Sequence, residues 1–221
     1  MAAVRVRQHV NPLSRKYQTT AEVPDWRSVF SNPDRPLHID IGCAKGYFLM
    51  QMAALQPDWN FLGLEIRAPL VDSALQQRDK DHQQNLHFLF CNANTSLTGL
   101  LESLPGDLLQ QVSIQFPDPW FKKRHQKRRV VQPELVQCLA DFLPSRGRVI
   151  LQSDVESVAQ EMCDRFAEHN AFHRTQPDWL LESPFPAQTD REQLTQEKGL
   201  PVYRAIFLKQ PSAEPELMPP A

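Results

Sequence analysis

The chain has 221 residues with 41% hydrophobic and 23% charged content, which suits one α/β domain with a full core and leaves too little for two. Its formal net charge of −2 excludes a chain that is basic throughout. No apolar run follows the first charges or reaches membrane-spanning length, and the cysteines and histidines show neither disulfide nor metal-ligand spacing. We therefore expect a cytoplasmic protein without a membrane span or a metal site.

Short apolar runs alternate with segments of helical periodicity along most of the chain. This alternation is typical of a doubly wound α/β fold with a mostly parallel sheet. Strands are predicted at 37–41, 60–65, 85–90, 112–116, 148–152 and 202–208, and helices at 47–55, 69–81, 133–142 and 155–169.

The two ends of the chain lack this pattern. Residues 211–221 are rich in Pro, Glu and Ala, so we expect a disordered tail there, with the main domain over 36–210. Residues 1–35 are expected to form a basic N-terminal arm that need not be ordered on its own. The charges of this arm are Arg5, Arg7, Arg15 and Lys16.

Polar side chains fall at or just past the ends of four predicted strands. Ligands of doubly wound sheets bind outside the carboxyl ends of the strands. We therefore expect these side chains to converge on one edge of the sheet and to form a binding site. They are Asp40, Glu65, Asn92 and Asp118.

The loop after the first predicted strand suits a nucleoside with a cationic end. Gly42 and Gly46 let a ligand approach the backbone closely, but the Gly-x-Gly-x-x-Gly spacing of a dinucleotide site is absent. Asp40 would repel a pyrophosphate and would attract an ammonium or sulfonium group. Glu65 is placed to bind two ribose hydroxyls, and Asn92 to meet an adenine edge. S-adenosylmethionine has these properties.

A second motif joins a fixed carboxylate to a dense block of positive charge. Asp118 lies between two prolines in Phe-Pro-Asp-Pro-Trp, and residues 122–129, here called the basic segment, follow at once. A local cationic patch on a near-neutral chain favours a docked polyanion, with a base presented to Asp118. The alternatives are that Asp118 caps a helix and that Trp120 anchors the loop instead of stacking on a base.

With these residues in hand, the chain resembles the bacterial tRNA (guanine-N7)-methyltransferase family from about Leu37 to Leu208. The resemblance implies a Rossmann-like methyltransferase sheet with helices on both faces and an antiparallel C-terminal strand. It also implies transfer of a methyl group from S-adenosylmethionine to N7 of a variable-loop guanine in tRNA, by a monomer or homodimer. The motifs that carry it are Asp-Ile-Gly-Cys at 40–43, Gly-Leu-Glu-Ile-Arg at 63–67, the Phe-Pro-Asp-Pro-Trp element and Thr-Asp-Arg-Glu at 189–192.

The resemblance also assigns site residues. Asp118 would be the catalytic acid. The cofactor would be bound by Asp40, Gly42, Glu65, Asn92 and Asp118, and the tRNA by Lys122, Asp154, Thr189 and Glu192.

Some of these roles have structural alternatives, and three positions depart from the family. Asp154 could instead cap a helix, and Thr189 with Glu192 has capping-box spacing. The family usually has glutamate at Asp40, glycine at Ala44 and aspartate at Asn92, so cofactor affinity is expected to shift while the chemistry survives.

Three other functions compete with tRNA methylation. A methyltransferase for proteins or small molecules would need a base for its nucleophile and would not need the basic segment. A non-catalytic RNA-binding protein with a relict pocket is favoured by Ala44 and Asp40 but disfavoured by Glu65, Asn92 and Asp118. A nicotinamide-dependent reductase is excluded by the glycine spacing.

Overall fold

The structure is a computed structural model that describes residues 10–211. The predicted arm charges Arg5 and Arg7, and all but the first residue of the predicted tail, lie outside the described residues. No helix between residues 10 and 211 is both long and apolar enough to cross a bilayer.

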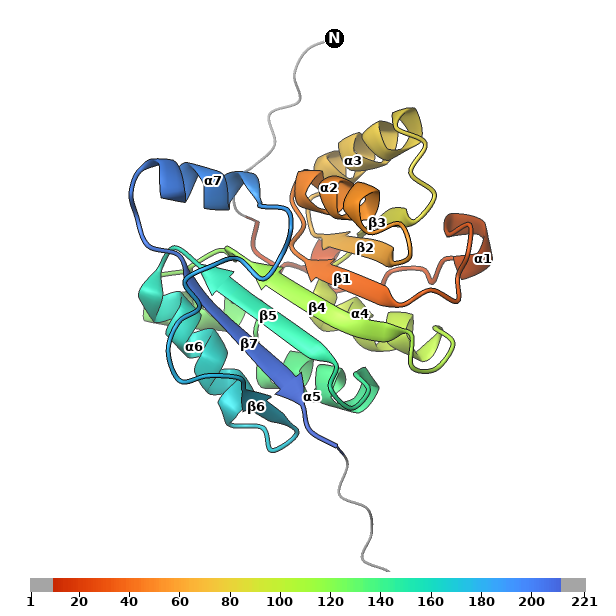
Figure 1. The fold of residues 1–221 in the computed structure, drawn as a ribbon. Helices are drawn as coiled ribbons and strands as arrows, with labels where there is room; N and C mark the ends of the chain where they lie inside the picture. Colours follow the sequence, from red (N-terminus) through yellow and green to blue (C-terminus); the bar gives the residue numbers. More distant parts are fainter. Residues whose placement is uncertain (1–9, 212–221) are drawn as a thin grey trace, which may run out of the picture.

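A seven-stranded sheet of order β3-β2-β1-β4-β5-β7-β6 organises the described chain (Figure 1). The pairs from β3 to β5 are all parallel, whereas β7 runs antiparallel to both β5 and β6. This confirms the predicted doubly wound, mostly parallel sheet with an antiparallel C-terminal strand. The strands are β1 Leu37–Ile41, β2 Asn60–Glu65, β3 Leu86–Phe90, β4 Leu109–Gln115, β5 Arg148–Ser153, β6 Phe172–Arg174 and β7 Tyr203–Lys209.

Helices cover both faces of the sheet (Figure 1), so every residue of the central strands β1 and β2 is buried. One core packs β1, β4 and β5 against α1 and α4–α6, and the other packs β2 and β3 against α2 and α3. The helices are α1 Trp26–Val29, α2 Tyr47–Leu55, α3 Ala68–Lys80, α4 Ala93–Glu102, α5 Pro133–Phe142, α6 Glu156–Ala167 and α7 Asp190–Glu197, with 3-10 turns η1 Arg15–Tyr17 and η2 Lys123–Arg128.

Residues 10–35 pack against the sheet domain, although their sequence shows no clean periodicity. Tyr17, Trp26 and Phe30 are buried. The indole N–H of Trp26 donates to Ser103 Oγ at 3.0 Å, beside α4. This part of the predicted arm therefore contributes to the core and reaches the edge of the sheet where the polar strand ends lie.

Candidate active site

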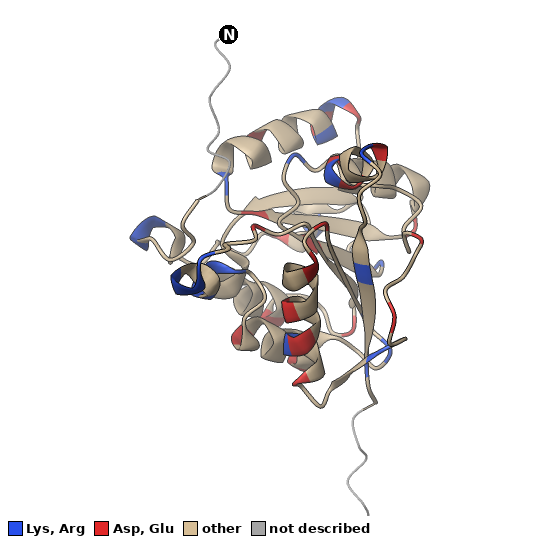
Figure 2. Cartoon of the chain, turned by 90° about the vertical axis from the view of Figure 1, so that its left-hand side faces the viewer, with Lys and Arg blue, Asp and Glu red and all other residues tan. Residues whose placement is uncertain are grey.

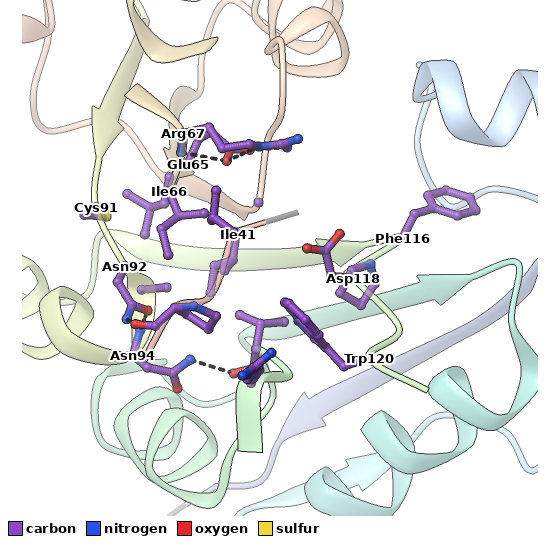
Figure 3. A pocket seen from close by; sticks show the side chains of 18 of the residues that line it. Ile41, Glu65, Ile66, Arg67, Cys91, Asn92, Asn94, Phe116, Asp118 and Trp120 are labelled. Atoms are coloured by element: carbon purple, nitrogen blue, oxygen red, sulfur yellow. Dashed lines mark hydrogen bonds and ion pairs between the residues drawn. The ribbon is translucent and has the colours of Figure 1, made fainter. Parts of the chain in front are cut away.

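Two cavities open at the carboxyl ends of β1, β2 and β4, on either side of the loop that follows β4. The smaller has a volume of about 140 Å³ and the larger about 690 Å³. Figure 3 shows the smaller one, with Glu65 and Asn92 on one side and Asp118 and Trp120 on the other. The residues that line both cavities are Gly42, Arg67, Gln115, Phe116, Pro117 and Asp118.

The loop between β1 and α2 leaves room for a ligand. Gly42 has φ +87°, and a Cβ atom added there would meet no protein atom within 4 Å. Gly46 caps α2 at φ +75°, where a Cβ would come within 2.5 Å of the Phe88 ring. Ala44 also takes a left-handed conformation, at φ +50°, which costs about 1–2 kcal/mol for a residue with a Cβ. A glycine at this position would avoid this strain.

Glu65 at the end of β2 is buried and fully engaged within the chain. Its carboxylate accepts hydrogen bonds from the backbone N–H groups of Ala44 and Arg67, each at 3.0 Å. The Arg67 guanidinium forms an ion pair with it at 2.8 Å. The hydrogen bond to Glu65 raises the pKa of Arg67, burial opposes this, and the nearby charge of Asp118 adds a smaller increase. No site role was predicted for Arg67 from the sequence.

Asp40 at the end of β1 lines the larger cavity and is 3% exposed. Ser113 Oγ and Gln115 Nε2 donate to its Oδ1 at 2.6 and 3.1 Å. Burial raises the pKa of Asp40 to about 6, while these two hydrogen bonds act in the opposite direction. A cationic ligand group beside Asp40 would compensate the buried charge.

Asn92 lies in the wall of the smaller cavity and has structural partners. Its side-chain oxygen caps α4 by accepting from Asn94 N–H at 3.2 Å. Its amide nitrogen donates to the carbonyls of Pro12 and Tyr17, at 3.3 and 3.1 Å. An aspartate could not make these donations, so the asparagine at this position fastens residues 12–17 beside the cavity.

Asp118 stands where the two cavities meet. Figure 3 shows its carboxylate turned toward the cavity, while Phe116 points away toward α7. Phe116 and Trp120 flank it at φ +48° and +41°, and such strain in non-glycine residues is typical of functional loops. The first described helical turn after it, η2, begins at Lys123, so Asp118 does not cap a helix.

The basic segment is partly exposed and partly folded inward. Arg128 lies over the Trp120 ring at 4.9 Å, and Arg129 donates to the Pro119 carbonyl and pairs with Glu161 of α6. Figure 2 shows the blue ribbon of η2 beside the red acidic bands of α6. The charges that remain exposed are Lys122, Lys123, Arg124 and Lys127.

The aromatic residues of this loop have different surroundings. The Trp120 ring makes an edge contact with His125 at 5.6 Å and also faces Arg128, so it is held within the loop. Phe121 is 72% exposed and lines the larger cavity beside the basic segment. The structure thus favours Trp120 as an anchor, and Phe121, which the sequence analysis overlooked, as the aromatic surface open to a base.

The far wall of the larger cavity is formed by residues after β5 and at the start of α7. Asp154 pairs with Arg191 Nε at 2.9 Å, and the Val155 N–H before α6 donates to Ser153 Oγ. Val155 is the N-cap residue of α6 and no side chain among the described residues caps this helix, so Asp154 does not take the helix-cap role considered for it. Thr189 caps α7 by accepting from Glu192 N–H at 3.1 Å.

Not every predicted site residue reaches the cavities. Asp40, Gly42, Glu65, Asn92, Asp118, Asp154 and Thr189 line one or both of them. Glu192 is completely buried on the inner side of α7, and Lys122 stands exposed outside. Within residues 10–211, no cluster of three or more His, Cys, Asp or Glu residues could hold a metal ion.

The chain is similar to known methyltransferases in sequence and in fold. The model of a methyltransferase family matches residues 34–205. The tRNA (guanine-N(7)-)-methyltransferase of Synechococcus elongatus is 60% identical over 212 residues, which cover 96% of this chain and 100% of that protein. The same enzyme from Trichormus variabilis is 60% identical over 205 residues, covering 92% and 95%. The crystal structure of the 16S rRNA methyltransferase KamB matches the fold with a TM-score of 0.58 at 14% identity, covering 86% of this chain and 95% of that one.

Proposed function

The chain belongs to the tRNA (guanine-N(7)-)-methyltransferase family, and we infer that it transfers a methyl group from S-adenosylmethionine to N7 of a guanine in tRNA. This membership confirms the resemblance seen in the motifs. The observation that supports the reaction at this site is the position of Asp118, between a pocket for a nucleoside and a cleft edged by exposed cations. We place the target guanine in the variable loop of the tRNA.

The residues present fit S-adenosylmethionine. The open space at Gly42 admits a ligand against the backbone, and the buried charge of Asp40 calls for a cationic partner. Glu65 would hold the ribose hydroxyls, and the pocket beside Asn92 would hold the adenine. When bound, this cofactor supplies an electrophilic methyl group on a sulfonium.

Asp118 can promote the transfer without acting as a base, because guanine N7 carries a lone pair and no proton. Positive charge grows on the guanine ring as N7 is methylated, and a fixed carboxylate stabilises it. The N1–H and N2–H donors of guanine lie on the edge opposite N7. Asp118 therefore either accepts hydrogen bonds from these donors or lies beside the N7 edge, but it does not do both at once. The delocalised ring charge can be stabilised from either edge. Placement of one such group is worth about 3 kcal/mol.

The tRNA side of the cleft is formed by the exposed part of the basic segment and by Phe121. Lys122 and its exposed neighbours would neutralise phosphates, and Phe121 would stack on a base next to the target. Asp154 and Thr189 line the far wall of this cavity and would contact the ribose or base from the other side.

The reaction can be tested with two tRNA transcripts that differ by one atom. One carries guanine at the variable-loop target and the other carries 7-deazaguanine there. With methyl-labelled cofactor, we expect label in the first transcript at that single position and none in the second. Equal labelling of both would refute N7 as the acceptor. Cofactor binding without any transfer would favour the binding-only alternative.

A further inference from the structure

Helix α7 forms a wall of the larger cavity but is not held there by an apolar face. Surface helices normally dock through a stripe of apolar side chains. In α7 the buried residues are Glu192 and Thr195, and Leu194 is 49% exposed. Figure 1 shows the helix across the carboxyl ends of the central strands, facing α2. A polar contact must therefore fix its position.

That contact is a buried ion pair between α7 and β7. Glu192 is 0% exposed, and its Oε1 lies 2.7 Å from Nη2 of Arg204, whose side chain is 3% exposed. Arg204 Nη1 also donates to the carbonyls of Leu181 and Val202. A charge buried this deeply is tolerated only when it is paired, so moving α7 would leave both charges uncompensated.

A series of hydrogen bonds runs from this ion pair across strands β5, β4 and β1 to the side of the cleft where the cofactor would bind. Gln152 Nε2 on β5 donates to Glu192 Oε2 at 3.2 Å and to Gln115 Oε1 on β4 at 2.8 Å. Gln115 Nε2 in turn donates to Asp40 Oδ1 at 3.1 Å. Asp40 and α7 are thus joined by two glutamine side chains that face each other on paired strands.

This chain of contacts is expensive to maintain. Among the described residues, Gln152 Oε1 and Arg204 Nε are buried without a hydrogen-bond partner. Each such atom costs about 1–3 kcal/mol, and an apolar core at this place would avoid that cost. Stability therefore does not explain why these contacting side chains are polar, whereas a role in positioning does.

We propose that Arg204, Gln152 and Glu192 are positioning residues. They hold α7 over the cleft and fix its position relative to Asp40. Thr189 and Arg191 are then fixed in the wall opposite Asp118. Glu192 acts from inside the protein, through Arg204, and not as a contact to the tRNA. The proposal rests on the proposed function, because it concerns the same cleft.

The ion pair can be tested with Arg204→Met, Glu192→Gln and the double variant. Arg204→Met leaves a buried unpaired carboxylate, so we expect α7 amide hydrogens to exchange about tenfold faster or more, and kcat/KM for tRNA to fall by a similar factor. Removing both charges should recover much of each loss. A double variant no better than Arg204→Met, or wild-type exchange and turnover in Arg204→Met, would overturn the anchor.

The link to Asp40 needs a variant that keeps the ion pair. Gln152→Met interrupts the path, and Gln111→Met is the matched control, because Gln111 is buried on β4 but bonds His38. S-adenosylhomocysteine should slow α7 exchange in wild type and in the control, but not in Gln152→Met. Equal protection in all three overturns the link. Hydrogen exchange of α7 without ligand tests the ion-pair anchor even if the protein methylates no tRNA. A failure of the proposed function can therefore be told apart from a failure of the anchor.

Discussion

Arg67 holds the Glu65 carboxylate through two hydrogen bonds, from Nε to Oε1 at 2.8 Å and from Nη2 to Oε2 at 2.9 Å. Both oxygens that would receive ribose hydroxyls are therefore already engaged, and the backbone N–H of Ala44 shares one of them. A bound nucleoside must share Glu65 with these donors. The arrangement fixes the carboxylate at the mouth of the smaller cavity before any ligand arrives.

Replacing Arg67 should destabilise the protein, because Glu65 is 2% exposed and would lose its counter-charge. Arg67 itself is 23% exposed, so water can replace part of the interaction. We expect Arg67→Met to lower the free energy of unfolding by about 1–3 kcal/mol, less than for a fully buried pair. Urea unfolding measures this, with Arg165→Met on α6 as the control, because Arg165 and its partner Glu168 are 36% and 65% exposed. An unchanged midpoint would show that the backbone donors alone support Glu65.

The sequence predicted the regular elements well and failed where local signals are weak. The helix at Pro133–Phe142 and the strand at Asn60–Glu65 have the predicted bounds. Helix α4 was missed because Asn94, Thr95 and Gly99 form helices poorly, although apolar residues recur along its buried face. Strand β6 has only three residues at the edge of the sheet, too few for a visible alternation.

The residues that line the cavities were largely predicted from the sequence, whereas the contacts between them and the residues behind them were not. Asp40, Glu65 and Asp118 could be placed because parallel strands end at one edge. The burial of Glu192 could not, since an isolated charge on a polar helix indicates an exposed face, and its partner Arg204 is brought near only by the antiparallel strand β7. Nor does sequence spacing show that Asn92 bonds Pro12 and Tyr17.

Asp40→Asn should stabilise the protein at alkaline pH while weakening cofactor binding. Burial raises the pKa of Asp40 to about 6, so above that pH the folded protein holds a carboxylate that ionises more easily when unfolded. The substitution should raise the free energy of unfolding by about 1–3 kcal/mol at pH 8, and the gain should vanish as the pH falls from 6 to 4. Urea unfolding at pH 8 and at pH 4 measures the stability.

The binding side of the same prediction is measured by calorimetry with S-adenosylhomocysteine. We expect weaker binding by Asp40→Asn at pH 8, because the ammonium of the ligand loses its buried counter-charge. Unchanged affinity together with the stability gain would mean that Asp40 does not face the cationic end of the ligand.

Asn92→Asp should loosen residues 10–17 while keeping the cap of α4. A carboxylate still accepts from Asn94 N–H, but it would face the Pro12 and Tyr17 carbonyls without a proton to donate. Hydrogen exchange in peptides over 10–17 should quicken by about tenfold. Asn94→Asp is the matched control, since Asn94 bonds Val130 instead. Equal exchange in the two variants would contradict the role given to Asn92.

Phe121→Ala and Trp120→Ala should separate binding from stability. The exposed Phe121 ring contributes little to folding, so its loss should leave the melting temperature unchanged and weaken tRNA binding by about 5- to 100-fold, the value of one base stack. Trp120→Ala should lower the melting temperature, because its ring holds His125 and Arg128. Wild-type tRNA affinity in Phe121→Ala would exclude it as the stacking surface.

The most direct test of the central claim is the single-turnover rate of methyl transfer to tRNA by Asp118→Asn. The amide keeps the shape of the side chain and removes its charge, so folding should stay near wild type. Saturating cofactor keeps any change in cofactor affinity out of the measured rate. If Asp118 stabilises the positive charge that develops on guanine, the rate should fall by about 100-fold or more. A rate within a few-fold of wild type, with the same bound cofactor and tRNA, would show that the carboxylate between the two cavities does not drive the reaction.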